Sequence, residues 1–248
     1  MRLHRFYIKG GDFTEKIGQA IKVDNEELAH QLLRVFRFGV GDKVIVFDGV
    51  GCEYVSEITI LTKKDLAVKL LEKSEFKIPS KKVNLYLALI KKGNFELAAE
   101  KCTEVGISGI HPVISERSEK KDINMERLNK IVIEASEQSG RMTVPEVFEP
   151  MDLEEAIMQA VSSDARRVIF DPSGLSLRDE QSKTGLDCHG NTLAMTKKEV
   201  SVFIGPEGGW SDSELELFKN NNFEIYSLGQ NILRAETAAI VATNLAVN

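Results

Sequence analysis

A glycine-rich junction near the C-terminus, Gly205-Pro206-Glu207-Gly208-Gly209, has the composition of a ligand-binding turn. It follows an apolar run and precedes Ser211 and Glu214, whose spacing is that of a helix capping box. Glycines at such a junction let backbone N–H and C=O groups approach a ligand closely. A tight strand-to-helix turn with no ligand explains these five residues equally well. The junction lacks the Lys-Ser/Thr ending of a P-loop and the glycine spacing of a dinucleotide-binding turn.

A second junction, Leu228-Gly229-Gln230-Asn231-Ile232-Leu233-Arg234-Ala235-Glu236-Thr237-Ala238, follows the next apolar run. Gly229 permits a sharp exit from a strand. Arg234 and Glu236 then fall in the first turns of an otherwise apolar predicted helix, where burying them without partners would be costly. A solvated helix start is the alternative interpretation. Ligands of open parallel sheets bind at the carboxyl ends of the strands, so two such junctions after successive strands favour one shared binding site.

From residue 83 onwards, patterns typical of strands alternate with patterns typical of helices. The two glycine-rich junctions lie between a predicted strand and the predicted helix that follows it. The predicted strands are the apolar runs 83–90, 110–114, 167–171, 200–204 and 223–228. The predicted helices have apolar residues at helical spacing and cover 94–105, 125–138, 153–161, 212–219 and 232–247. This alternation predicts an α/β domain with a mostly parallel sheet. Residues 173–198 are polar and irregular, which predicts a mobile surface loop.

Residues 1–72 have a different pattern, that of short strands around one helix. The predicted strands cover 3–8, 43–48, 52–60 and 66–71. Asp24 has the position of a helix N-cap, and apolar residues follow it at helical spacing. Closely spaced short strands predict a small barrel. The polar, lysine-rich segment 73–82 contains Pro79 and predicts a linker, so we expect domains at 1–72 and 83–248.

The composition is that of an ordinary globular protein, with 42% hydrophobic and 28% charged residues. No apolar run reaches the length of a membrane span, and the first residues lack the apolar stretch of a signal peptide, so we expect a cytoplasmic protein.

The cysteines and histidines are scattered without metal-ligand spacing, so we expect no metal. The net charge of −6 argues against a nucleic-acid partner, but residues 1–72 balance 11 basic with 11 acidic side chains, which leaves room for a basic face.

Together the two junctions resemble those of the SPOUT, or trefoil-knot, methyltransferases. Within that superfamily the chain resembles the bacterial 16S rRNA uridine-N3 methyltransferases, which modify uridine 1498, and the resemblance extends over the whole chain. Further matching segments are His30-xxx-Arg34, Gly41-Asp42, Lys101-xx-Glu104-Val105-Gly106 and Ala135-x-Glu137-Gln138-Ser139-Gly140-Arg141. The resemblance implies a PUA-like RNA-binding β-barrel at 1–72 and a trefoil-knotted α/β domain at 83–248, although knots are rare among protein folds.

The resemblance also implies S-adenosyl-L-methionine (SAM) as the cofactor, bound in a bent form by backbone groups of the two junctions. The adenine would lie among Leu228, Ile232, Leu233 and Ala238. The implied cofactor-binding residues are Ile204, Gly205, Pro206, Glu207, Gly208, Gly209, Leu228, Gly229, Ile232, Leu233, Thr237 and Ala238. SPOUT enzymes are typically homodimers with the active site at the subunit interface, and the resemblance implies a homodimer here.

Methylation of uridine N3 requires loss of the N3 proton, which a positioned base and a nearby positive charge would assist. Arg141 and Arg234 are the candidates to stabilise the anion or to orient the base. Glu207 or Glu236 is the candidate proton acceptor, and the sequence does not choose between them. We expect at least one of the two carboxylates to pair with an arginine as a structural group.

Uridine N3 lies on the Watson–Crick edge, so the target base must be unpaired or splayed out. The implied partner is 16S rRNA in the small ribosomal subunit, with Arg2, Arg5, Arg34 and Arg37 as candidate phosphate contacts. The family usually has Pro-Arg where this chain has Gln230-Asn231, so one cation near the site is missing.

Two alternative functions stay open. One is a non-catalytic RNA-binding or ribosome-assembly factor that keeps the fold, and the other is a related SPOUT methyltransferase that acts on transfer RNA or on another atom.

Overall fold

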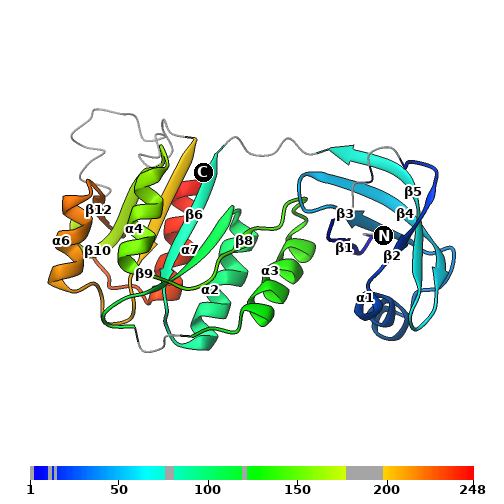
Figure 1. Cartoon of the computed structure of the whole chain (residues 1–248), viewed down its shortest axis with the longest axis horizontal. Helices are drawn as coiled ribbons and strands as arrows, with labels where there is room; N and C mark the ends of the chain where they lie inside the picture. Colours follow the sequence, from blue (N-terminus) through cyan, green and yellow to red (C-terminus); the bar gives the residue numbers. More distant parts are fainter. Residues whose placement is uncertain (1–2, 11–12, 14–15, 76–80, 119–121, 177–197) are drawn as a thin grey trace. The chain divides into compact units, whose positions relative to one another are not determined.

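A computed structural model describes residues 3–10, 13, 16–75, 81–118, 122–176 and 198–248 of the chain (Figure 1). It divides into two compact units. The first unit contains Met1–Ile78 and Ser136–Val144, and the second contains Pro79–Ala135 and Pro145–Asn248. The predicted surface loop at 173–198 lies almost entirely outside the described residues, as does Arg2.

The first unit is built on a curled five-stranded sheet, as the closely spaced short strands predicted. In spatial order its strands are β1 (Arg5–Tyr7), β3 (Lys43–Phe47), β4 (Cys52–Leu61), β5 (Leu66–Glu75) and β2 (Ala20–Val23). Strands β1 and β3 pair in parallel, and the other neighbours pair antiparallel. Every second residue of β4 from Tyr54 to Ile58 is buried, because alternate side chains of a strand point to one face. Strand β2 was not predicted, and its first three residues are exposed or half-buried.

The helix of the first unit begins one residue later than predicted. Asn25, and not Asp24, is the N-cap: its side-chain Oδ1 accepts a hydrogen bond from the Leu28 N–H at 2.9 Å. The reason is geometric, because Asn25 has the extended backbone from which a cap side chain reaches the first turn. Helix α1 (Glu26–Gln31) continues directly into a π-helical turn, η1 (Leu32–Phe36). That turn ends at Arg37, whose left-handed φ is 57°.

The segment Ser136–Val144 comes from the middle of the chain and yet is grouped with the first unit. The Gly51 N–H donates to the Met142 carbonyl at 3.1 Å, and the Val144 N–H donates to the Gly49 carbonyl at 3.1 Å. The backbone of this segment therefore pairs with the turn between β3 and β4. The predicted domain boundaries had placed these residues in the second domain, because pairing between distant segments leaves no local pattern.

The second unit is an α/β domain with a parallel sheet, as predicted. The sheet has the order β12-β10-β11-β6-β7-β8, with β9 also paired to β7, and every pairing is parallel. The strands are β6 (Lys82–Ala88), β7 (Gly109–Ile114), β8 (Glu146–Val147), β9 (Met151–Asp152), β10 (Arg166–Ser176), β11 (Glu199–Ile204) and β12 (Glu224–Ser227). The strand predicted to be buried on both faces is the central β6, where the four residues from Leu85 to Ala88 are all buried.

Helices cover both faces of this sheet (Figure 1). They are α2 (Lys92–Val105), α3 (Met125–Ser139), α4 (Leu153–Ser162), α6 (Asp212–Asn220) and α7 (Ala235–Val247). One apolar cluster joins α4 and α6 to Tyr86 and Phe203 of the sheet. Helix α7 packs against α2, β6 and β11. It begins three residues later than predicted, because Arg234 has an extended backbone and forms the N-cap, so that Arg234 precedes the first turn of the helix.

Candidate functional site

A cavity of about 610 Å³ opens at the carboxyl ends of three neighbouring strands in the second unit. Its lining consists of 170–172 after the first part of β10, 204–210 after β11, and 227–235 with Ala238 after β12. These strands are adjacent in the order β12-β10-β11, so their carboxyl ends meet at one edge of the sheet. This is the position at which open parallel sheets bind ligands.

The cavity brings the two predicted junctions together. Of the residues predicted to bind a cofactor, those that line it are Ile204, Gly205, Pro206, Glu207, Gly208, Gly209, Leu228, Gly229, Ile232, Leu233 and Ala238. Thr237 does not line it and is exposed on α7. Of the four candidate catalytic residues, Glu207 and Arg234 line the cavity, whereas Arg141 and Glu236 do not.

A third segment of the cavity wall was missed in the sequence. Asp171 and Pro172 follow the predicted strand at 167–171 and line the cavity together with Phe170. The Asp171 carboxylate accepts a hydrogen bond from the Ser173 N–H at 2.9 Å, which closes a tight turn. A Cβ atom on Gly174 would lie 2.6 Å from the Tyr226 carbonyl carbon, so the close approach of β10 to β12 requires glycine there. The run Asp-Pro-Ser-Gly after an apolar strand was the available signal.

The glycine-rich loop after β11 folds around Trp210. The indole ring is buried and packs edge-on against Phe218, with ring centroids 4.9 Å apart. A Cβ atom on Gly205 would lie 3.1 Å from this ring, which explains the glycine. The predicted capping box is present, because Ser211 Oγ accepts from the Glu214 N–H while the Glu214 carboxylate accepts from the Ser211 N–H. The loop is therefore held by its own tryptophan and by the start of α6.

The two candidate proton acceptors differ in their surroundings. Glu207 is exposed at the cavity wall, and its Oε1 accepts a hydrogen bond at 3.3 Å from the N–H of Lys91, the N-cap of α2. Glu236 is 6% exposed in the first turn of α7, and within the described part of the chain its Oε2 has no hydrogen-bond partner. A carboxylate near a helix N-terminus interacts favourably with the helix dipole, which offsets part of the cost of burying Glu236. Only Glu207 has direct access to the cavity.

Arg234 lies at the entrance to α7. Its side chain is exposed and makes no capping hydrogen bond, and its carbonyl accepts the Ala238 N–H at 2.8 Å. The preceding turn contains Gly229, with φ of 131°, and Ile232, which is 87% exposed. Arg234 and Glu207 are thus the exposed charged side chains on the two loops after β11 and β12, and the half-exposed Asp171 adds a second carboxylate to the cavity wall.

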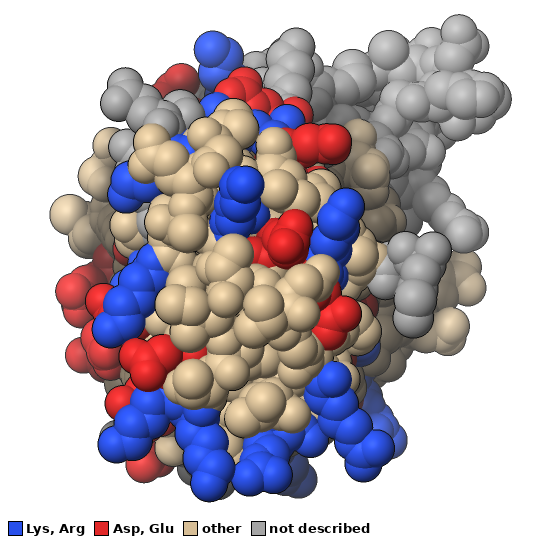
Figure 2. Space-filling model, turned by 90° about the vertical axis from the view of Figure 1, so that its right-hand side faces the viewer, with Lys and Arg blue, Asp and Glu red and all other residues tan. Residues whose placement is uncertain are grey.

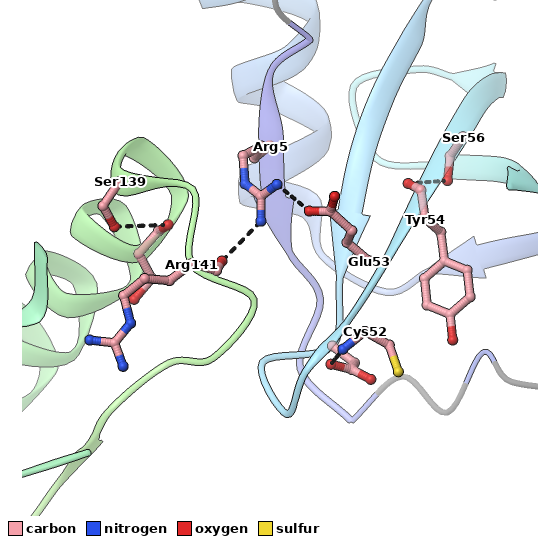
Figure 3. A network of polar contacts seen from close by, with 9 residues as sticks. Arg5, Cys52, Glu53, Tyr54, Ser56, Ser139 and Arg141 are labelled. Atoms are coloured by element: carbon pink, nitrogen blue, oxygen red, sulfur yellow. Dashed lines mark hydrogen bonds and ion pairs between the residues drawn. The ribbon is translucent and has the colours of Figure 1, made fainter. Parts of the chain in front are cut away.

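Two arginines that were predicted to act on RNA or substrate are held in the first unit (Figure 3). Arg5 was a candidate phosphate contact, but its side chain is only 9% exposed, pairs with Glu53 and donates to the Arg141 carbonyl at 2.9 Å. In this arrangement the Arg5 guanidinium is buried and paired, unlike the exposed side chains of the other described candidates. Arg141 donates to Thr143 Oγ1 at 3.1 Å, and burial lowers the pKa of its guanidinium to about 10.

Arg34 and Arg37, the other described candidates for phosphate contacts, are exposed on the first unit. Among the residues that the structure describes, no group of three His, Cys, Asp or Glu side chains could hold a metal ion. In the same residues no helix is long and apolar enough to cross a membrane.

Comparison with known proteins agrees with this geometry. Residues 77–247 match the model of an RNA methyltransferase domain, and residues 23–71 match that of an RNA methyltransferase PUA domain. A ribosomal RNA small subunit methyltransferase E of Rickettsia conorii is 29% identical over 98% of this chain and 94% of its own length. A protein of the same name from a Synechocystis species is 31% identical over 86% of this chain and 68% of its own length.

A solved structure has the same architecture. The crystal structure of a ribosomal RNA small subunit methyltransferase E from Neisseria gonorrhoeae, bound to S-adenosyl methionine, has a TM-score of 0.82 and 26% sequence identity. The match covers 98% of this chain and 95% of that chain. With its α/β sheet, its curled N-terminal sheet and both matching domain models, this chain belongs to the RNA methyltransferase family of the ribosomal RNA small subunit methyltransferases E.

Proposed function

We propose that this protein uses SAM to methylate N3 of uridine 1498 in the 16S rRNA of the small ribosomal subunit. The observation that carries the proposal is the cavity at the carboxyl ends of β10, β11 and β12. Its volume of about 610 Å³ lies within the range of roughly 300–1,000 Å³ that small-molecule sites occupy. The SAM bound to the similar protein of Neisseria gonorrhoeae supports the assignment.

The residues of the cavity fit the parts of SAM. Leu228, Ile232, Leu233 and Ala238 offer an apolar wall for an adenine ring. The backbone of the glycine-rich loop offers N–H and C=O groups for the polar parts, because glycine lets a ligand approach the main chain. Bound SAM would supply an electrophilic methyl group. Thr237 faces solvent, so we leave it out of the proposed cofactor site.

We assign the removal of the uridine N3 proton to Glu207 and the stabilisation of the uridine anion to Arg234. Both side chains are exposed at the cavity, as groups that meet a large substrate must be. The Lys91 N–H donates a hydrogen bond to Glu207 Oε1 and so orients the carboxylate. Once Glu207 has taken the proton, the N3 lone pair would be free to accept the methyl group of bound SAM, whose sulfur would keep the electron pair of the broken bond and leave as a neutral thioether. Glu236 has a structural role in this proposal, because it is buried and does not line the cavity.

A trefoil knot and a homodimer form part of the same proposal. Strand β12 is at one edge of the sheet, whereas α7 packs on β6, β11 and α2. The chain must therefore pass back across β10 between β12 and α7, and such a return path supports a knot. A second subunit would cover exposed apolar side chains of this segment, of which Ile232 and Val241 are the clearest. Sedimentation analysis of the full chain tests the dimer.

We propose that the first unit, of which the predicted domain at 1–72 is the main part, binds the RNA. The match of residues 23–71 to an RNA methyltransferase PUA domain supports this role. The exposed side chains of Arg34 and Arg37 are the proposed phosphate contacts. Figure 2 shows Lys and Arg side chains, with Asp and Glu side chains among them, around a largely uncharged area on one face of the molecule. Cations at such a border are available for phosphate contacts.

Mass analysis of ribosomal RNA tests the proposed reaction. Small subunits isolated from a strain that lacks this gene should have an unmodified uridine 1498, and the purified protein with SAM should restore one methyl group on N3. Digestion and sequencing of the product would place the methyl group. A methyl group on another nucleotide or atom would replace the proposed target, and SAM binding without any transfer would favour a non-catalytic RNA-binding factor.

A further inference from the structure

The glycine-rich loop is held from outside by a residue that has no part in the proposed chemistry. Arg117 follows β7 and lies 91 residues before Gly208 in the chain. Its Nη1 donates to the Gly208 carbonyl at 2.9 Å and to the Trp210 carbonyl at 3.3 Å. A Cβ atom on Gly208 would lie 3.4 Å from the Arg117 Cβ and Cδ atoms, so the aliphatic part of Arg117 packs directly on this glycine.

These two hydrogen bonds fix the orientation of two peptide planes. In a planar trans peptide the C=O and the following N–H point in opposite directions. The 208–209 peptide therefore contacts Arg117 through its carbonyl and the Pro206 carbonyl through the Gly209 N–H, at 2.9 Å. The 210–211 peptide contacts Arg117 through its carbonyl and the Glu214 carboxylate through the Ser211 N–H, at 2.8 Å. Both planes are held at both ends.

Glu214 links the same two segments a second time. The residue is 5% exposed, and the carboxylate oxygen that does not bind Ser211 accepts the Glu116 N–H at 2.8 Å. Glu116 and Arg117 are adjacent, so the 115–118 turn contacts the glycine-rich loop through two neighbouring residues. Hydrogen bonds between Ser115 and Ser118 stabilise that turn. In the described part of the chain Arg117 forms no ion pair with a carboxylate, so its donors serve the backbone of the loop.

From this geometry we infer that Arg117 is a positioning residue for cofactor binding, which holds the backbone of the 205–210 loop in its ligand-binding conformation. The inference rests on the proposed SAM site and adds to it the residue that organises the loop. A loop that already has its ligand-binding conformation loses less conformational entropy when the ligand binds. Loss of this preorganisation therefore weakens the affinity for the ligand and leaves the rate of methyl transfer from the bound state unchanged. Hydrogen bonds from a charged donor have the strength needed for a measurable effect.

The test compares Arg117→Met with Arg117→Lys in the full chain. Methionine keeps an unbranched chain against Gly208 and removes the guanidinium donors, whereas lysine keeps the charge and one donor group. Arg127→Met is the matched control, because it removes an exposed arginine that pairs with Glu96 outside the cavity. Trp210 is the one tryptophan of the sequence and lines the cavity, so its fluorescence reports SAM binding directly.

We expect Arg117→Met to raise the Kd for SAM about tenfold, the loss that follows from one charge-assisted hydrogen bond. At saturating SAM its kcat should stay close to the wild-type value, and Arg117→Lys should recover part of the affinity. A melting temperature close to that of Arg127→Met would show that the variant is folded. An unchanged Kd in Arg117→Met, or a fall in kcat at saturating SAM with an unchanged Kd, would overturn the positioning role. Wild-type protein that fails to bind SAM would instead overturn the proposed function and this inference together.

Discussion

Arg234 and Glu207 are the two exposed charged side chains that the structure places at the cavity on the loops after β11 and β12. Their positions follow from different local causes. Glu207 belongs to a loop that is folded around a buried tryptophan and held by Arg117. Arg234 precedes the first turn of α7, where it has an extended backbone and an exposed side chain. Asn231 also lines the cavity and has no charge, so Arg234 has no second cation beside it on this loop.

Arg234→Ala should therefore lower turnover far more than it lowers SAM affinity. Loss of one group that stabilises developing charge slows a reaction by roughly 10²–10³-fold. A residue that acts on the transition state lowers kcat and kcat/KM together. Single-turnover methyl transfer at saturating SAM and RNA measures the effect, with Kd for SAM measured separately.

A structural role for Arg234 predicts other results. The variant would then lose thermal stability or its oligomeric state, and its activity would fall in proportion. The melting temperature and the sedimentation profile distinguish the two roles. Methyl transfer at a near wild-type rate, or failure only because the variant no longer assembles, would remove Arg234 from the proposed chemistry.

At the scale of elements, four aromatic rings form a ladder across neighbouring strands of the parallel sheet. The rings of Phe148, His111, Tyr86 and Phe203 stack in that order, with centroid distances of 4.0, 4.2 and 4.3 Å. The strand register produces the ladder, because Tyr86 is aligned with both His111 and Phe203. His111 is 2% exposed, and within the described residues neither of its ring nitrogens has a hydrogen-bond partner. Burial lowers the pKa of His111 to about 4.

This histidine should make the second unit less stable in acid. The ordinary pKa of histidine is about 6.5, so between pH 6.5 and 4 the unfolded chain binds a proton that the folded chain does not. Stability is then complete above pH 6.5 and falls as the pH decreases toward 4. The loss attributable to His111 is about 3 kcal/mol over this interval.

The measurement is the free energy of unfolding by urea between pH 4 and pH 8, for the wild type and for His111→Phe. Phenylalanine keeps a flat ring in the ladder and cannot bind a proton. The carboxylates with lowered pKa, such as Glu96 and Glu224, affect both proteins alike and cancel in the difference. Equal pH dependence in the two proteins would contradict the prediction.

At the scale of the whole molecule, the chain leaves and re-enters its first unit. Within Ser136–Val144, Glu137 and Arg141 contact β1, whereas Met142 and Val144 pair with the 49–51 turn. The Glu137 carboxylate accepts the Tyr7 N–H at 2.9 Å, and the Arg141 carbonyl accepts from Arg5. Glu137 and Arg141 belong to the segment that resembles this branch of the family most specifically. Their hydrogen bonds to β1 therefore give this segment a structural role in the first unit.

RNA binding should depend on salt through the exposed arginines of the first unit. The variant Arg34→Gln with Arg37→Asn should weaken binding of 16S rRNA, because two phosphate contacts are lost. Asparagine suits position 37, where the backbone is left-handed. The slope of log affinity against log salt should fall by about 1–2, since each contact contributes roughly 0.7–0.9.

The control removes two cations from the second unit, with Lys219→Gln and Arg127→Gln, and so changes the net charge equally. Filter binding at several salt concentrations compares the three proteins. If the control lowers the slope as much as the Arg34 and Arg37 variant does, the net charge of the protein explains the effect and the proposed contacts are wrong.

The sequence by itself determined the features that depend on neighbours in the chain. Helical and strand periodicity placed most of the elements, and the Ser211–Glu214 capping box was predictable because it joins residues three apart. The two glycine junctions identified both loops that make up most of the cavity. These signals are local, since a buried strand, a helix cap and a backbone that must approach a ligand each restrict the residue types at their own positions.

Only the tertiary structure decided which distant residues meet. The strand order β12-β10-β11 brought 170–172 into the cavity, and the fold placed Arg117, in the turn after β7, on the Gly208 carbonyl. The same kind of long-range contact buried Arg5 against Glu53. The sequence around an arginine does not show whether its guanidinium contacts solvent, a carboxylate or a backbone carbonyl, because the partner is set by the fold and not by the neighbouring residues.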